Sequence, residues 1–127
     1  MTIGLWQTLS YRDADAGLAW LEAVGFTPKE VYRDPADASL VQHAELLWPA
    51  GGGVMLGSHR DNPDWPQQPG TGAAYLVTDD PDAVHRAAID AGATSLREPR
   101  DEDYGGRGAT VRDPEGNLWS FGSYAPA

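Results

Sequence analysis

The feature that most constrains the fold is an internal repeat, because the two halves of the chain share residues at a nearly constant offset. The matched segments are Asp15-Ala16 with Asp82-Ala83, Gly25 with Gly92, and Leu56-Gly57-Ser58 with Phe121-Gly122-Ser123. The first two matches lie 67 residues apart and the third lies 65 apart. A period this long is too large for a solenoid and indicates duplication of a whole supersecondary unit. We therefore expect two modules of similar structure.

Each half contains one segment with the pattern of a short amphipathic helix. The first follows Asp13, a residue suited to cap a helix N-terminus, and it ends at Gly25. The second follows Asp79-Asp80-Pro81 and ends at Gly92. Both have apolar residues on one face only, so each helix is expected to lie against a sheet. His85 sits beside the apolar stripe of the second helix, and we expect it to be exposed.

The other segments read as β-strands separated by turns rich in proline and glycine. The expected strands are residues 5–11, 27–33, 40–48, 53–58, 73–77, 94–97, 108–112 and 117–123. Each half therefore reads as strand, helix and three strands. The prediction is one α+β domain over 1–127, with module 1 at about 1–59, a linker at about 60–71 and module 2 at about 72–127.

Composition argues against several classes of function. The chain has no cysteine, which excludes a disulfide framework, a thiolate metal site and a cysteine nucleophile. The formal net charge of −10 argues against a nucleic acid or an anionic membrane as partner, since both attract clustered Lys and Arg. The sequence shows no leader pattern and no apolar run of membrane-spanning length. We expect a cytoplasmic protein.

Five segments carry patterns more specific than strand alternation. They are Tyr11-Arg12-Asp13-Ala14-Asp15-Ala16, His43-Ala44-Glu45-Leu46, Val54-Met55-Leu56-Gly57, Tyr104-Gly105-Gly106-Arg107 and the hairpin segment from Arg112 to Gly122. Together they resemble the vicinal-oxygen-chelate (glyoxalase/bleomycin resistance protein/dioxygenase) superfamily over essentially the whole chain, and its small glyoxalase-like branch in particular. The resemblance implies two βαβββ modules whose curved mixed sheets surround a cleft, with the helices outside. Many members are homodimers, and some build their pockets between subunits.

The resemblance also implies where a metal would bind. Metal-dependent members place one ligand on the first strand of each half and another, usually Glu, on the last strand. The corresponding positions here are Trp6, Met55, Ala73 and Ser120. None of these side chains is a good ligand for a divalent cation. A register error of one residue would bring in only Gln7, so we expect no metal and no cofactor, and a binding protein rather than an enzyme.

Aromatic and polar residues of the predicted strands are the candidates for a ligand site. Strand alternation puts Trp6 and Thr8 on one face, which the metal positions identify as the cleft side, with Tyr75 and Ser120 facing them. The expected ligand-binding residues are Trp6, Thr8, Glu45, Met55, Tyr75, Tyr104, Arg107 and Ser120. Aromatic walls suit a planar or hydrophobic ligand, although core packing explains each strand tryptophan equally well. Trp20, on a helix, is better explained as core or interface.

Two polar features remain open to more than one interpretation. His43 and Glu45 share one face of a strand, so they could bind a cation or act in acid–base chemistry. A pair that faces solvent or a dimer partner is the interpretation we favour. Arg107 follows two glycines, and it could hold an anion or a carbonyl oxygen. It could equally pair with the acidic residues 101–103.

The function predicted from these residues and the resemblance is a metal-free, homodimeric protein that binds a small organic ligand, cationic or aromatic, in resistance or sequestration. The alternative is a glyoxalase-like lyase or isomerase, or a dioxygenase-related enzyme, with a metal relocated to His43 and Glu45. A metal-free lyase or isomerase would use Glu45 as its base. A third possibility is a structural or regulatory protein without a small ligand.

Overall fold

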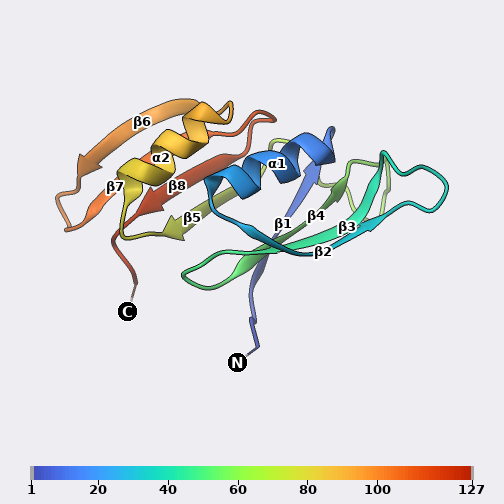
Figure 1. The fold of residues 1–127 in the computed structure, drawn as a ribbon, viewed down its shortest axis with the longest axis horizontal. Helices are drawn as coiled ribbons and strands as arrows, with labels where there is room; N and C mark the ends of the chain where they lie inside the picture. The colour runs from blue at the N-terminus through green and yellow to red at the C-terminus, as the bar shows by residue number, and fades with distance from the viewer. Residues whose placement is uncertain (1, 127) are drawn as a thin grey trace.

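The computed structural model describes residues 2–126 and has the predicted α+β architecture (Figure 1). Module 1 contains β1 (Trp6–Tyr11), α1 (Ala14–Val24), β2 (Thr27–Arg33), β3 (Val41–Leu47) and β4 (Gly53–Ser58). Module 2 contains β5 (Ala73–Val77), α2 (Pro81–Asp90), β6 (Thr94–Asp101), β7 (Arg107–Arg112) and β8 (Leu118–Gly122). Both halves are therefore βαβββ units, as predicted. No helix of the described residues is long and apolar enough to span a membrane.

The two sheets have the same topology, which makes the sequence repeat visible as structure. Their strand orders are β1-β4-β3-β2 and β5-β8-β7-β6. In each sheet the first and last strands of the module pair in parallel, and the remaining pairs are antiparallel. The sheets stay separate and do not close into one barrel. The main difference from the predicted elements is β6, which continues past the expected end at residue 97 to Asp101. The strand includes Pro99, which is tolerated because β6 lies at the edge of its sheet.

Both helices cover the same side of the two sheets (Figure 1). We call the opposite side of each sheet its open face. The Asp13 side chain caps α1 by accepting a hydrogen bond from the Ala16 backbone N–H at 3.1 Å, and Asp80 caps α2 in the same way. His85 does not follow the prediction. The His85 side chain is buried, because it lies on the face of α2 that packs against β6, and its Nε2 is 2.8 Å from Ser95 Oγ of that strand.

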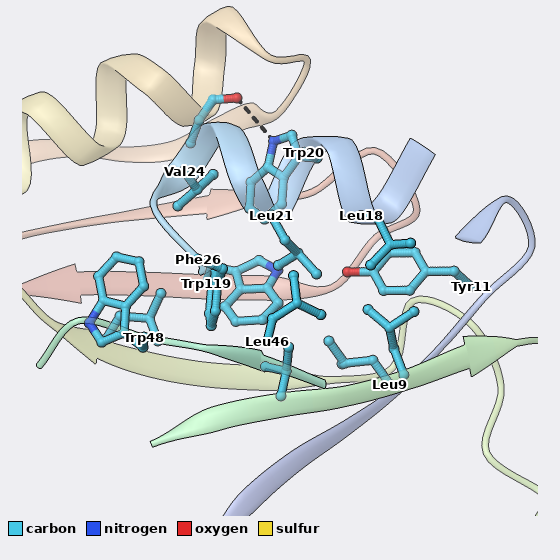
Figure 2. Close-up of a cluster of buried hydrophobic side chains, with 14 of the residues drawn as sticks. Leu9, Tyr11, Leu18, Trp20, Leu21, Val24, Phe26, Leu46, Trp48 and Trp119 are labelled. Carbon is cyan, nitrogen blue, oxygen red and sulfur yellow. Dashed lines mark hydrogen bonds between the residues drawn. The ribbon is translucent and has the colours of Figure 1, made fainter. Parts of the chain in front are cut away.

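The hydrophobic core is shared between the modules. The Trp119 ring of β8 lies 5.9 Å from Trp20 of α1 and 5.8 Å from Phe26, measured between ring centroids (Figure 2). Trp20 Nε1 donates to the Ala88 carbonyl on α2 at 3.1 Å. Trp48, also buried, donates through Nε1 to the carbonyl of Val77 at 2.8 Å. Three of the tryptophans are therefore core residues that join one module to the other.

A buried carboxylate organises the β7–β8 hairpin. Asp113 is only 3% exposed. Its Oδ2 accepts hydrogen bonds from Tyr11 Oη at 2.8 Å, Asn117 Nδ2 at 3.0 Å and Trp119 Nε1 at 3.1 Å. Its Oδ1 accepts from the backbone N–H groups of residues 115–117. The charge is thus buried with a complete set of donors, one of which comes from β1 of the other module.

The same hairpin also binds the start of α1. The Glu115 carboxylate accepts the backbone N–H groups of Arg12 and Asp13 at 2.6 and 2.7 Å. Gly70 of the linker has φ of +78°, and a Cβ there would lie 2.3 Å from the Glu115 carbonyl oxygen. Only glycine fits this approach of two backbones. The linker, the hairpin and the first helix therefore meet at one point between the modules.

The burial of Tyr11 predicts a loss of stability at high pH. Burial, and then the Asp113 carboxylate, raise the pKa of Tyr11 above its usual value of 10.0. Its stabilising contribution is complete below pH 10 and is lost as the pH rises above 10, where only the unfolded chain loses this proton. The expected slope is about 1.4 kcal/mol per pH unit.

Urea unfolding between pH 9 and pH 11.5 measures this slope. Tyr11→Phe should remove the part that is due to Tyr11, although it also lowers stability at neutral pH by depriving Asp113 of a donor. Tyr32→Phe, at an exposed tyrosine on β2, is the matched control and should keep the wild-type slope. Equal slopes for Tyr11→Phe and the wild type would contradict the assignment.

Candidate functional site

A cavity of about 330 Å³ lies on the open face of module 1, where the linker passes over the sheet. We call it the module 1 cavity. Its floor includes Thr8 and Ser10 of β1, His43 of β3 and Met55 of β4. Thr8 is paired with Met55, and Ser10 with Gly57, across the parallel strands β1 and β4. Strand alternation therefore brings the predicted residues Thr8 and Met55 together on one face.

The rim of the module 1 cavity comes from the linker. Arg60, Asn62 and Trp65 line it. A turn positions Trp65, since its backbone N–H donates to the Asn62 carbonyl at 3.0 Å. Gln67 fastens the linker to β1 by donating from Nε2 to the Thr8 carbonyl at 2.9 Å. Sequence reasoning treated this segment only as a connection, although a tryptophan in an otherwise polar loop was a usable signal.

His43, in the floor of the module 1 cavity, forms an imidazole–carboxylate pair with Glu45, which lies just outside the cavity lining. His43 Nε2 lies 2.9 Å from Glu45 Oε2, and the His43 ring stacks on Tyr32 with centroids 6.3 Å apart. Lys29 Nζ approaches Glu45 at 4.0 Å. Within residues 2–126, no group of three or more His, Asp or Glu side chains is placed to hold a metal ion. The pair could orient a polar ligand or accept a proton, but it offers a metal only two donors.

The positions that carry metal ligands in metal-dependent relatives do not form a donor set. The Trp6 ring lies over Gly53, where a Cβ would be 2.7 Å from its Cζ3 atom. Met55 lies in the floor of the module 1 cavity. On module 2, Ala73 is exposed, and the Ser120 hydroxyl is 3.0 Å from that of Thr110. An indole, a thioether, a methyl and one hydroxyl do not fit a divalent cation.

The remaining predicted ligand residues lie outside the module 1 cavity. Trp6 and Tyr75 line a second cavity, of about 290 Å³, between β1 and β5. Ser120 is paired with Tyr75 across β5 and β8, on the open face of module 2. Tyr104 is in the loop between β6 and β7 and packs against Tyr124, a residue that sequence reasoning did not single out. The structure therefore brings Trp6 and Tyr75 of the two modules into one cavity, whereas Thr8 and Met55 line another.

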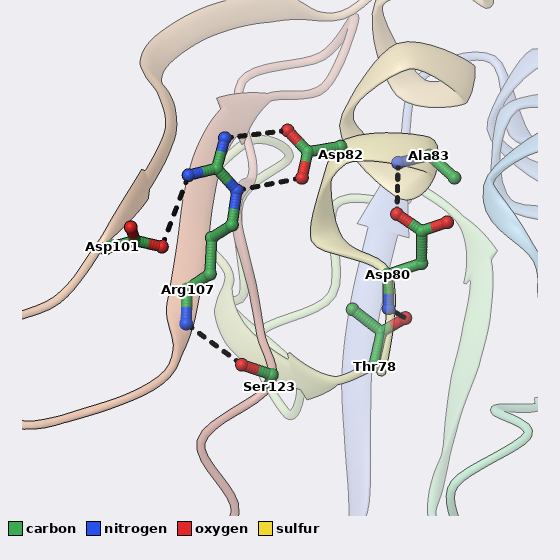
Figure 3. Close-up of polar contacts among 7 residues, drawn as sticks. All are labelled: Thr78, Asp80, Asp82, Ala83, Asp101, Arg107 and Ser123. Carbon is green, nitrogen blue, oxygen red and sulfur yellow. Dashed lines mark hydrogen bonds and ion pairs between the residues drawn. The ribbon is translucent and has the colours of Figure 1, made fainter.

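Arg107 lies on the side of the sheet that carries α2 (Figure 3). Its guanidinium makes a bidentate ion pair with Asp82 of α2, with Nε and Nη2 at 2.8 and 3.0 Å from the carboxylate oxygens. Nη1 lies 3.4 Å from Asp101. Hydrogen bonding to Arg107 holds the pKa of Asp82 below its usual value. These contacts agree with the interpretation in which Arg107 pairs with nearby carboxylates. Asp101 was among the expected partners, and Asp82 is an additional one.

The fold and these faces define a class of protein: a small α+β chain with two βαβββ modules, each with an open sheet face. A model of the Glyoxalase/Bleomycin resistance protein/Dioxygenase superfamily matches residues 5–121. The chain belongs to this superfamily, which confirms the resemblance inferred from the motifs. A comparison with curated proteins gave no match.

Solved structures with the same fold include TioX from Micromonospora sp. ML1, which is 28% identical with a TM-score of 0.74 and is matched over 96% of this chain and 100% of its own. A glyoxalase/bleomycin resistance protein/dioxygenase family enzyme from Burkholderia phytofirmans PsJN is 22% identical, with a TM-score of 0.71. The match covers 92% of this chain and 94% of that enzyme. A glyoxalase/bleomycin resistance protein from Streptomyces sp. CB03234 is 23% identical, with a TM-score of 0.62. The match covers 92% of this chain and 98% of that protein. The last two show similarity of fold alone.

Proposed function

We propose that the protein binds a small organic ligand in the module 1 cavity without a metal ion. The observation that carries this proposal is the cavity itself, about 330 Å³ in volume and lined by hydroxyl, thioether and indole groups. This volume is within the range of about 300–1,000 Å³ typical of small-molecule sites. The family's metal positions here hold Trp6, Met55, Ala73 and Ser120, which do not suit a metal.

The lining of the cavity favours a planar ligand with a polar edge. Trp65 is 52% exposed at the rim, so its indole is accessible for stacking. Thr8 and Ser10 supply hydroxyl groups from the floor, and Asn62 supplies an amide from the rim. The net charge of −10 attracts a cationic ligand. A role in drug binding, as resistance or sequestration, agrees with these features and with the superfamily.

A homodimer is part of this proposal. The open faces expose large side chains, including Tyr32 on module 1 and Leu118 on module 2, which a second copy would cover. Sedimentation equilibrium tests this directly, and a monomer at micromolar concentration would contradict it.

Binding of a planar cation should depend on Trp65. We expect proflavine to bind the chelator-treated protein, with heat and quenching of tryptophan fluorescence that saturate at one ligand per chain. Trp65→Ala should weaken binding by about tenfold or more, since loss of a stacked ring costs about 1–3 kcal/mol. Trp65→Phe keeps an aromatic ring and should recover most of the affinity. Unchanged affinity in Trp65→Ala would contradict placement of the ligand in the module 1 cavity.

One observation favours an enzyme as the second candidate. The His43–Glu45 pair, 2.9 Å apart, has its imidazole in the floor of the cavity and could act as a base there, either alone or with a bound ion. Calorimetric titration with Ni²⁺, Zn²⁺, Mn²⁺ and Fe²⁺ separates the two candidates. Binding of one ion per chain that is lost in Glu45→Gln would contradict the metal-free proposal. No heat at micromolar metal would support it.

A further inference from the structure

Three tyrosines form an exposed cluster on module 2, separate from the module 1 cavity. They are Tyr75 on β5, Tyr104 in the β6–β7 loop and Tyr124 after β8. Their exposed fractions are 43%, 64% and 46%. Single exposed aromatic residues are ordinary on a protein surface, whereas contiguous exposed rings mark binding surfaces.

The tyrosine cluster is held in place by specific contacts. Tyr75 Oη donates to the Tyr124 carbonyl at 2.7 Å. The Tyr75 side chain lies over the backbone of β8 at Gly122, where a Cβ would be only 2.1 Å from its hydroxyl oxygen. Tyr104 and Tyr124 pack edge to face, with centroids 5.4 Å apart and an interplanar angle of 87°. The glycine therefore makes room for one ring, and the other two support each other.

The backbone segments that carry Tyr104 and Tyr124 are also joined. Glu102 N–H donates to the Gly106 carbonyl at 2.9 Å and closes the turn that presents Tyr104. The backbone N–H of Arg107 donates to Ser123 Oγ at 2.9 Å (Figure 3). The Ser123 N–H donates back to the Arg107 carbonyl at 3.0 Å. The rings are thus presented on fixed supports, which lowers the entropy lost when a ligand binds.

The surroundings of the tyrosine cluster favour a cation. Aromatic ring faces carry negative electrostatic potential and attract ammonium groups. The acidic residues 101–103 directly precede Tyr104 in the chain. Two cationic side chains of this region are engaged in ion pairs, Arg97 with Glu102 and Arg107 with Asp82 and Asp101. Burial, and then Tyr104 and Glu102, raise the pKa of Tyr75, so its phenol stays neutral and keeps its hydrogen bond.

We propose that the tyrosine cluster is a second binding site, which takes an alkylated ammonium group of a small organic molecule. A group of this kind has positive charge and methyl surface but few or no hydrogen-bond donors. It is recognised by ring faces rather than by carbonyl oxygens. This site does not depend on the module 1 cavity, because the two share no lining residue.

The test is an NMR titration of the full chain with benzyltrimethylammonium chloride. We expect the ring signals of the three tyrosines to shift and to saturate in the millimolar range. Tyr104→Ala and Tyr124→Ala should each weaken binding about three- to tenfold, as loss of one cation–π contact predicts. Tyr32→Ala removes an exposed tyrosine of module 1 and should leave the affinity unchanged, as should Trp65→Ala.

Benzylsulfonate, with a similar ring and the opposite charge, is the matched probe and should not shift these signals. Tyr104→Leu retains apolar surface without an aromatic face, so it should bind as weakly as Tyr104→Ala and also guards against a local loss of structure. The proposal would be overturned if the sulfonate bound as well as the ammonium. It would also be overturned if the Tyr104→Ala, Tyr124→Ala double variant kept the wild-type affinity while its amide spectrum showed an intact fold.

Discussion

Asp113→Ala is expected to lower the free energy of unfolding by about 5 kcal/mol, which is close to the whole stability of a marginal domain. The substitution removes the acceptor of six hydrogen bonds. It leaves the Tyr11 hydroxyl and the Trp119 indole N–H buried without their partner, and each such group costs about 1–3 kcal/mol. Urea denaturation followed by circular dichroism measures the loss.

Asp113→Asn is the informative comparison. It preserves the size of the side chain and one acceptor oxygen but loses the charge, so an intermediate loss of about 2–3 kcal/mol is expected. Asp103→Ala, at an exposed position of the β6–β7 loop, is the matched control and should change stability by less than about 0.5 kcal/mol. A loss below 1 kcal/mol for Asp113→Ala would show that the hairpin does not depend on the carboxylate.

The second large effect is expected for Trp119→Ala, at about 3–5 kcal/mol. Trp119 is 1% exposed and contacts Trp20 and Phe26 of module 1 from its place on β8. The cavity left by its removal would lie between the modules, where neither sheet can collapse to fill it. Amide hydrogen exchange should therefore show loss of protection in both modules at once.

The control for Trp119→Ala is Trp65→Ala, which removes a ring of the same size from the exposed rim of the module 1 cavity. Its expected effect on unfolding is below about 0.5 kcal/mol. If module 1 kept its protection in Trp119→Ala while module 2 lost it, the modules would be independent folding units. That outcome would contradict the shared core.

The sequence predicted the order and type of the elements because its local signals were strong. Asp13 and Asp80 cap the two helices, which begin at Ala14 and Pro81, one residue after each cap. The turn at residues 113–116 separates β7 from β8, as its proline and glycine indicated. Such signals act over a few residues and need no knowledge of the rest of the chain. The offset between the halves then supplied the common register.

Contacts between distant segments were beyond this reasoning. The path of α2 over the sheet decides that Arg107 meets Asp82 and that His85 meets Ser95. Periodicity places these residues on a helix or strand face but does not say which neighbour that face contacts. Trp65 was missed for the same reason, because its role depends on where the linker passes over β1 and β4.

The candidate ligand residues were expected around one cleft, with Trp6 and Thr8 of module 1 facing Tyr75 and Ser120 of module 2. In the structure Trp6 and Tyr75 line one cavity, between β1 and β5. Thr8 lines the module 1 cavity with Met55, its partner across β1 and β4, and Ser120, on β8, lies beside Tyr75. Strand alternation assigns side chains to a sheet face, but the distance between the faces of two sheets depends on the packing of the whole chain.

The separation of the open faces from the shared core has a consequence for how such a protein can diversify. Thr8, Met55 and Trp65 line the module 1 cavity but are not members of the buried cluster that joins the helices to the sheets. Under the proposed function, we expect substitutions there to change which molecule is recognised while leaving folding nearly unaffected. On this proposal, new specificities would be accessible by single mutations, both to natural selection and to protein engineers who keep the tryptophan core and redesign the opposite surface.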